Sequence, residues 1–528
     1  MSTLRELQMY GRFMVGLPAF FRRRITVEQA EAAIRLGLAE REANLLRLAR
    51  RGIYDNPRSP YRKLLEMAGC TYGDLESSVR TKGLEPTLRA LRAEGVYVTF
   101  EEYKGRQPLV RGGQTFEIDP HDFDNPLATR AYAGTTGGST GAGTRVETDL
   151  DNIYALTQHV MIGRDVHGVL TLPGAVWKGT LPDPIGVQVL LGSVLYQNIP
   201  QRWFTPVTRD DYVPPLRFRM ATRYILWMSR VCGVPFPQPE PLPLDQAVVL
   251  ARWAAEAVRA HGGCQVVSSV SLGMRVCIAA KEAGLDLTGA KFFGGGEPIT
   301  PAKMAAFRAV GARHVTIYVS VDAGVMGLPC ANPIEDNDQH LLEDNVALIQ
   351  HPRAVLGSDV EVNAFYFTSL CDKSSKILFN AESDDYGIVE ERACGCRLEQ
   401  LGYRRHLRQI RSFGKLTGEG VTLVGSEMIR ILEHVLPSTH GGTAQDYQLL
   451  EEHDEQGFTR LVLLIDPKVP ISSEQAVIDT ILDTLKGGSE AGGLTQSFWK
   501  RAGTFRIRRQ PPVWTTRGKL PLILRGNQ

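Results

Sequence analysis

The chain has 528 residues, of which 43% are hydrophobic and 22% are charged. That length predicts two or three domains, and the composition is typical of a globular protein. Sixty Lys and Arg residues against 58 Asp and Glu residues give a net charge of +2, which argues against a general nucleic-acid binder. No uncharged apolar run is long enough to cross a bilayer, so we expect no membrane span. Eight cysteines are too few for a disulfide scaffold, and we expect a cytoplasmic protein.

The first half of the chain changes from a helical pattern to an alternating one. Helical spacing of Ala, Leu and Ile predicts a helix over 26–50, and a second helical pattern lies at 82–94. Two prolines in 55–62 interrupt the helical pattern, and a loop-rich stretch lies at 106–127. From 150 to 330, short apolar runs alternate with helical segments, which predicts a parallel sheet with helices on its faces. The expected strands include 187–191, 264–270 and 314–321, and the expected helices include 250–262, 271–284 and 301–311.

A polar, glycine-rich run at 411–420 precedes a C-terminal portion with its own strand pattern at 459–466 and helix pattern at 472–488. The run is a candidate hinge to a small domain, although taken alone it is more typical of a surface loop. The predicted fold class is α/β. We expect a large N-terminal α/β domain with several subdomains and a small C-terminal α+β lid domain.

One loop combines glycines with small hydroxyl residues. Glycines let backbone N–H groups approach a phosphate chain, and hydroxyl groups donate further hydrogen bonds. The loop has neither the lysine of a Walker A motif nor the spacing of a dinucleotide-binding motif. Its composition alone is also compatible with a solvated surface loop. The candidate phosphate-binding residues are Thr136, Gly137, Gly138, Ser139, Thr140, Gly141 and Thr144.

This loop resembles the phosphate loop of the adenylate-forming superfamily, and its form without a terminal lysine is similar to the phenylacetate–CoA ligase-like branch. Gly143 stands where that family often has proline. A second motif follows in the family's order: Gly296, Glu297 and Pro298 resemble the turn that contacts adenine. An ordinary turn between a strand and a helix is the alternative for this segment.

The segment Tyr318–Asp322 resembles the family's Tyr-Gly-x-Thr-Glu motif. The resemblance implies that Tyr318 stacks on adenine and that Val321 lies beside the α-phosphate, where the family has a hydroxyl residue. It also implies that Asp322 holds Mg²⁺, because aspartate keeps the oxygen ligand of the family's glutamate on a shorter side chain. Val319 replaces the motif's glycine.

Three later segments carry further matches. Asp384, with Asp385 close behind, lies where the family has a ribose-binding aspartate, whose carboxylate accepts from both hydroxyl groups; an acidic surface turn is the alternative. Lys415 replaces the family's hinge arginine, and Thr417 replaces its hinge acid. Lys519 ends a segment that resembles the family's Pro-x-Thr-x-x-Gly-Lys motif. The resemblance implies that Lys519 is catalytic, because a cation must offset the charge between a carboxylate and the α-phosphate.

The cysteines include a Cys-x-Cys pair, Cys394 and Cys396, and Cys330 and His340 lie upstream. Some members of the phenylacetate–CoA ligase-like branch carry such a set and bind zinc. Three thiolates and one imidazole make a closed tetrahedral site, so we expect these four residues to hold a structural Zn²⁺. Four side chains without a metal in a reducing compartment are the alternative.

The resemblance implies a core domain over 1–412, a hinge at 413–417 and a lid domain over 418–528. It implies ATP and Mg²⁺ as cofactors and the activation of a carboxylic acid, aromatic or otherwise small, as an acyl-adenylate with release of pyrophosphate. The acyl group then passes to the thiol of CoA. The final 38 residues carry eight Lys or Arg residues and no acid, which suits a lid that closes over phosphates.

Two other functions stay open at this point. The acceptor is CoA in the first hypothesis, and the phosphopantetheine of a carrier protein or an amine in the second. In a third, the chain is a catalytically silent nucleotide-binding scaffold, for which the replaced motif residues argue. We expect no nucleic-acid partner, and a homodimer stays open.

Overall fold

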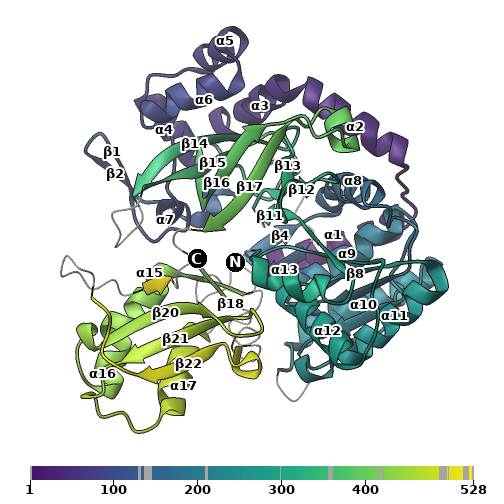
Figure 1. The fold of residues 1–528 in the computed structure, drawn as a ribbon. Helices are drawn as coiled ribbons and strands as arrows, with labels where there is room; N and C mark the ends of the chain where they lie inside the picture. The colour runs from purple at the N-terminus through teal and green to yellow at the C-terminus, as the bar shows by residue number, and fades with distance from the viewer. Residues whose placement is uncertain are drawn as a thin grey trace.

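In the part of the chain that it describes, the computed structural model has three larger sheets and three two-stranded ones, with helices around them (Figure 1). The residues that the structure describes are 3–128, 132–135, 145–207, 212–297, 299–320, 322–354, 361–412, 415–418, 421–486, 496, 499–514 and 523–525.

The N-terminal region is helical. The helix predicted over 26–50 is divided at Glu40 into α2 (Val27–Ala39) and α3 (Arg41–Ala49). Thr26 begins α2 with a capping box, in which its hydroxyl accepts from the Gln29 backbone N–H and the Gln29 side chain accepts from the Thr26 N–H. The other elements before the sheets are α1 (Thr3–Phe20), η1 (Arg50–Tyr54), α4 (Pro60–Met67), α5 (Tyr72–Lys82), α6 (Leu84–Ala93), α7 (Phe100–Tyr103), β1 (Leu109–Arg111), β2 (Gln114–Phe116) and η2 (Pro120–Phe123).

A six-stranded parallel sheet follows, in the order β10-β9-β8-β5-β6-β7, and it confirms the prediction from the alternating pattern. Successive side chains point to opposite faces. Val176 therefore packs with residues of α8, α9 and α10, whereas Trp177 packs with α11 and α12. The strands are β5 (Gly174–Trp177), β6 (Arg202–Thr205), β7 (Pro239–Pro241), β8 (Cys264–Val267), β9 (Ala290–Gly294) and β10 (Arg313–Thr316). The helices are α8 (Leu150–Val166), α9 (Pro184–Leu195), α10 (Leu216–Val231), η3 (Leu244–Gln246), α11 (Val248–His261), α12 (Val270–Glu282) and α13 (Pro301–Arg308).

One predicted strand is wrong, because residues 187–191 lie in α9. The Asp183 side chain caps this helix by accepting from the Ile185 N–H, and Pro184 occupies its first turn. Most of α9 is buried, so the run has no polar face, and a short apolar run does not distinguish a buried helix from a strand. The predicted strand at 314–321 is divided between β10 and β11, which belong to different sheets.

A seven-stranded antiparallel sheet occupies the top of Figure 1, in the order β11-β12-β13-β17-β16-β15-β14. Its apolar face packs against α3, α5 and α6 of the helical N-terminal region. The strands are β11 (Tyr318–Ser320), β12 (Gly324–Pro329), β13 (Gln339–Leu341), β14 (Val346–Ala354), β15 (Glu361–Ser369), β16 (Ala381–Glu391) and β17 (Arg405–Ser412), and the short helix α14 (Arg397–Leu401) lies between the last two.

The C-terminal part has its own four-stranded sheet, in the order β22-β21-β20-β23, at the lower left of Figure 1. It packs against the large region, where the Arg275 guanidinium lies 4.4 Å from the ring centroid of buried Phe458. The division at 413–417 stays a prediction, although β17 ends at Ser412 and a new hairpin begins at Lys415. The elements are β18 (Lys415–Gly418), β19 (Val421–Val424), α15 (Gly425–Arg430), η4 (Ile431–Val435), α16 (Leu436–His440), η5 (Ala444–Asp446), β20 (Tyr447–His453), β21 (Thr459–Ile465), α17 (Glu474–Lys486), β22 (Phe505–Arg509) and β23 (Ile523–Arg525).

Candidate active site

A β-hairpin bounds the glycine-rich loop. Strands β3 (Tyr132–Thr135) and β4 (Arg145–Thr148) pair antiparallel, and their register ends with Thr135 opposite Arg145. The seven candidate phosphate-binding residues between them lie outside the described residues. The hairpin leads through the N-cap residue Asp149 into α8.

The predicted adenine turn lies at the carboxyl edge of the parallel sheet, where ligands of such folds usually bind. Glycine is required there, because a Cβ on Gly294 would lie 2.0 Å from the Ser268 carbonyl oxygen. A Cβ on Gly295 would lie 2.2 Å from the carbonyl oxygen of Ile317. Gly296 has a φ of +84°, a conformation that favours glycine. The sequence Gly-Gly-Gly therefore allows three strand ends to meet closely at this edge.

Glu297 points away from this edge into the protein. Its carboxylate accepts from the backbone N–H of Ser271 at 3.1 Å and from the Ser271 hydroxyl at 2.5 Å. The Lys303 ammonium lies 3.4 Å from the same carboxylate, and both side chains are buried. Glu297 thus joins the turn to α12 and α13, so the backbone rather than this side chain is left to face a nucleotide. Pro298 lies outside the described residues.

Tyr318 of β11 is hydrogen-bonded to a residue of β16, a strand of the same sheet that is not its neighbour. Its hydroxyl donates to Asp385 Oδ2 at 2.7 Å, and the Ser412 hydroxyl donates to Asp385 Oδ1 at 2.5 Å. Burial, followed by the Asp385 carboxylate, raises the pKa of Tyr318 well above its usual value, so the hydroxyl stays protonated as a donor. The ring is packed against Phe367, with a centroid distance of 6.1 Å. The structure therefore brings the predicted adenine-stacking residue and an aspartate together.

The aspartate that accepts from Tyr318 is Asp385, whereas the sequence favoured Asp384 as the ribose-binding residue, and that role stays a prediction. Asp384 is buried and has a φ of +65°, at a point where the pairing of β16 with β15 shifts register. The Tyr318 hydroxyl donates to Asp385, and the Asp384 carboxylate also lies close enough to contribute to the raised pKa of Tyr318.

Asp322 is ion-paired. Its Oδ2 lies 3.2 Å from Lys104 Nζ, and both side chains are about nine-tenths buried. Burial alone would raise the pKa of Asp322, but Lys104 and then Lys376 outweigh it and lower the pKa. A carboxylate that a lysine already neutralises does not fit the magnesium-ligand role predicted for Asp322, and the nearby cations would repel a divalent ion. Sequence reasoning missed Lys104, which lies 218 residues away and belongs to no motif.

The remaining predicted residues receive little or no structural description. Lys415 lies in β18, opposite Val424, and its side chain is not described. Val321 and Lys519 lie outside the described residues. Their roles stay predictions.

The four predicted zinc ligands lie together, and their ligand atoms are all within 4.8 Å of one another. His340 Nε2 lies 3.2 Å from Cys396 Sγ and 3.5 Å from Cys394 Sγ. Tetrahedral zinc with its usual bond lengths would separate neighbouring ligand atoms by about 3.5–3.8 Å, so the residues fit the metal. Cys330 and His340 come from the paired region of β12 and β13, and the two other cysteines precede α14.

Surrounding hydrogen bonds orient these ligands. His340 Nδ1 donates to the Tyr403 carbonyl oxygen at 2.8 Å, which leaves Nε2 facing the three sulfur atoms. The Glu399 carboxylate accepts from the backbone N–H groups of Cys394 and Gly395. The hydrogen bond that the Cys330 thiol donates lowers the pKa of Cys396 despite burial, and it raises the pKa of Cys330. One thiol of the cluster thus readily becomes a thiolate.

Another buried contact, missed from the sequence, joins three parts of the large region. His159 Nε2 of α8 lies 2.8 Å from Asp344 Oδ2, and the Tyr403 hydroxyl donates to Asp344 Oδ1 at 2.7 Å. Burial alone would lower the pKa of His159, but the Asp344 carboxylate outweighs it and raises the pKa. The contact links the helix after the glycine-rich loop to the segment after α14.

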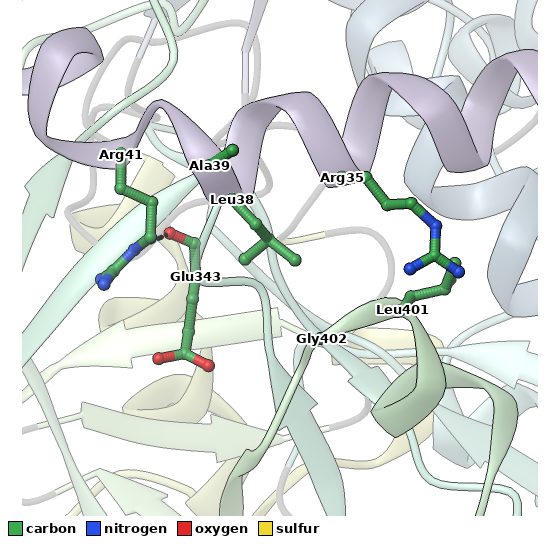
Figure 2. A pocket seen from close by; sticks show the side chains of 7 residues that line it. All are labelled: Arg35, Leu38, Ala39, Arg41, Glu343, Leu401 and Gly402. Atoms are coloured by element: carbon green, nitrogen blue, oxygen red, sulfur yellow. Dashed lines mark hydrogen bonds between the residues drawn. The ribbon is translucent and has the colours of Figure 1, made fainter.

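A surface pocket of about 480 Å³ lies elsewhere, beside α2 (Figure 2). Its arginines already have partners. Arg41 Nε donates to the Glu343 carbonyl oxygen at 2.6 Å, and Arg35 donates to the Gln400 carbonyl oxygen at 3.2 Å. The pocket contains none of the nucleotide motif residues. Its lining consists of Arg35, Leu38, Ala39, Arg41, Glu343, Leu401 and Gly402.

No family model and no curated protein matches the sequence. Among solved structures, 2-hydroxyisobutyryl-CoA ligase in complex with 2-HIB-AMP and CoA is similar, with 14% identity and a TM-score of 0.53. The match covers 96% of this chain and 91% of the ligase. The chain has the fold of this CoA ligase. This result confirms the fold that the ordered motifs predicted.

A postadenylation-state structure of the same ligase, with R3-HIB-AMP, matches at 14% identity and a TM-score of 0.44, over 92% of this chain and 89% of that one. An anthranilate CoA ligase in complex with anthranoyl-AMP matches at 12% identity and a TM-score of 0.36, over 82% and 74%. Among the helices that the structure describes, none is long and apolar enough to cross a membrane.

Proposed function

We propose that the protein activates a carboxylic acid with ATP and transfers the acyl group to the thiol of CoA. The observation that carries the proposal is the hydrogen bond between Tyr318 and Asp385 beside the adenine turn, in a chain with the fold of an enzyme bound to an acyl-AMP and CoA. In the first step, a carboxylate oxygen attacks the α-phosphorus of ATP, and the bond to pyrophosphate breaks. In the second step, the thiol sulfur attacks the acyl carbon, and AMP leaves.

Each of these residues has a separate role in the proposed reaction. Tyr318 stacks on adenine, and Asp385 fixes the tyrosine hydroxyl with one oxygen while it offers its carboxylate to the ribose hydroxyls. The backbone of the glycine turn approaches the base, because Gly294 and Gly295 leave room for it. Lys519, by resemblance, offsets the charge that develops between the acid and the α-phosphate. No step is assigned to Mg²⁺, because Lys104 already neutralises Asp322.

A pyrophosphate-release assay over a panel of aromatic and small aliphatic acids tests the proposal. CoA, a phosphopantetheinyl carrier protein and amines, each added in turn, then identify the acceptor. Lys519→Ala is expected to abolish pyrophosphate release, whereas Lys500→Ala, a change in an exposed lysine, should leave it unchanged. Equal rates in the wild type and Lys519→Ala would refute the role of Lys519.

A nucleotide-binding scaffold is the second candidate, and the ion pair between Asp322 and Lys104 favours it. The two functions differ in one measurement. A scaffold binds ATP in calorimetry but releases no pyrophosphate with any acid of the panel, whereas absence of both binding and release would refute both functions.

We also infer a structural Zn²⁺ at Cys330, His340, Cys394 and Cys396. The metal would hold β13, the residue after β12 and the segment before α14 together, because its ligands come from these three places. Zinc would supply structural stabilisation only, since a site with four protein ligands leaves no open position.

A further inference from the structure

Helix α10 exposes a stripe of large apolar side chains. Leu216, Met220, Trp227 and Val231 are 63%, 54%, 57% and 61% exposed. With 3.6 residues per turn, these four positions fall within about 60° of the helix circumference. The opposite face, which includes Phe218, Ile225 and Leu226, is buried in the protein core. The stripe is therefore a single outward face of a firmly packed helix.

Arginines border this stripe. Arg219, Arg223 and Arg230 are exposed and lie within about 40° of one another, next to the apolar residues. The side chains of the three form no ion pair and no hydrogen bond with any residue in the described ranges. The helix contains no Asp or Glu, so its surface charge is entirely positive.

Helix α1 extends the same surface. The Tyr224 hydroxyl of α10 donates to the Met14 carbonyl oxygen of α1 at 2.9 Å, which places the two helices side by side. Next to this contact, Met14 is 44% exposed and Val15 is 82% exposed. The apolar surface thus spans two neighbouring helices. In Figure 1, α10 lies on the right, away from the C-terminal sheet at the lower left.

We propose that this surface, formed by α10 and the Met14–Val15 segment of α1, docks the protein on an anionic lipid membrane. A convex helix with a central apolar stripe and a basic border matches a bilayer interface, where apolar side chains enter the acyl boundary and arginines contact acidic headgroups. Tryptophan is favoured at that interface. A second copy of the chain fits less well, because it would bring unpaired arginines against each other. The docking is peripheral, since no described helix can cross the bilayer.

Vesicle flotation with the full chain tests the proposal. We expect binding to vesicles that contain phosphatidylglycerol, weaker binding at high salt and little binding to pure phosphatidylcholine. Replacement of Arg219, Arg223 and Arg230 by glutamine should weaken binding on the order of 100-fold, since each arginine near an anionic surface contributes about fivefold. Trp227→Ser should also weaken binding, because it removes an aromatic anchor.

A matched control variant removes three positive charges from surfaces outside α10. Arg89, Arg252 and Arg259 are exposed and lie outside α10, and their joint replacement by glutamine should leave flotation nearly unchanged. Equal losses in the two triple variants would contradict the proposal, and so would equal binding to neutral and anionic vesicles. A dimer in light scattering that Trp227→Ser dissociates, with no flotation of the wild type, would assign the surface to a second copy instead.

Discussion

The Tyr318 hydroxyl donates to Asp385 Oδ2 at 2.7 Å, although 67 residues separate the two in the sequence. They lie in β11 and β16, strands that are not neighbours in the seven-stranded sheet. Ser412, the last residue of β17, holds the second oxygen of the same carboxylate. One aspartate thus connects the aromatic residue of the candidate adenine site to the end of the large region.

Asp385→Asn should weaken ATP binding more than Asp384→Asn does. In the proposed complex the ribose hydroxyls donate to the Asp385 carboxylate, and the first change removes its charge. A hydrogen bond to a charged group contributes about 1.5–3 kcal/mol, which corresponds to a loss of roughly 10- to 150-fold in affinity. The second change is a suitable control, because asparagine tolerates the φ of +65° at position 384. Calorimetry with ATP measures both variants. A larger loss for Asp384→Asn would restore Asp384 as the ribose ligand.

Local motifs predicted where the glycine turn and Tyr318 lie in the fold, because such motifs indicate where strands end. The glycine turn and Tyr318 follow successive parallel strands, so the sequence placed both at one edge. The choice between Asp384 and Asp385 depended on the pairing of β16, which no local pattern fixes. The strand predicted at 187–191 failed for a similar reason, since burial on all sides removes the polar positions that mark a helix.

Contacts between distant segments could not be predicted at all. Lys104 ends a short helix far from every motif, and only the folded chain brings it to Asp322. The zinc ligands are the exception among distant contacts. A set of three cysteines and one histidine in this pattern is typical of a metal site. The structure places the ligand atoms of the four residues within 4.8 Å of one another.

Lys104→Met should destabilise the fold by about 3–5 kcal/mol, because it leaves the Asp322 carboxylate buried without its counter-ion. The double variant Lys104→Met/Asp322→Asn should recover much of this loss, since it buries no unpaired charge. Urea unfolding measures all variants at neutral pH. Lys63→Met, a change outside the ion pair, is the control. If it lowers the free energy of unfolding by the same small amount as Lys104→Met, the buried pair does not contribute to stability.

The ion pair between Asp322 and Lys104 should also make the stability of the fold depend on pH. The folded-state pKa of Asp322 is lowered, so its contribution to stability is present above the unfolded value of about 3.9 and is lost as the pH falls through the folded pKa. The difference in unfolding free energy between wild type and the double variant should therefore shrink below about pH 4. A difference that stays constant from pH 6 to pH 2 would contradict the lowered pKa.

Lys303→Met should destabilise the protein by about 3–5 kcal/mol, because Glu297 is then buried without a cation. Glu297→Gln/Lys303→Met should be milder, since the Ser271 backbone N–H can still donate to the glutamine oxygen and the Ser271 hydroxyl can accept from the glutamine amide. Thermal unfolding measures stability. The ATP affinity of the double variant is the second measurement. An affinity equal to that of the wild type would support the inference that the Glu297 side chain does not contact adenine.

Removal of zinc should lower the melting temperature, because metal binding contributes directly to the stability of a site whose ligands come from separate segments. Purified protein should contain about one zinc per chain, and Cys396→Ser should lose it. Cys70→Ser, outside the cluster, should retain it. A wild-type protein without stoichiometric zinc would refute the site.

His159 should stabilise the fold more at pH 6 than at pH 8. Burial disfavours its charged form, but the Asp344 carboxylate at 2.8 Å outweighs burial and raises the pKa above the usual value of about 6.5. A raised folded-state pKa means that the stabilisation is fully present below about pH 6.5 and is lost as the pH rises through the folded pKa. The difference in unfolding free energy between wild type and His159→Gln should therefore decrease from pH 6 to pH 9. His121→Gln, which changes a largely exposed histidine, is the control for the loss of an imidazole. If the difference for His159→Gln grows with pH, then burial and not Asp344 determines the charge of His159.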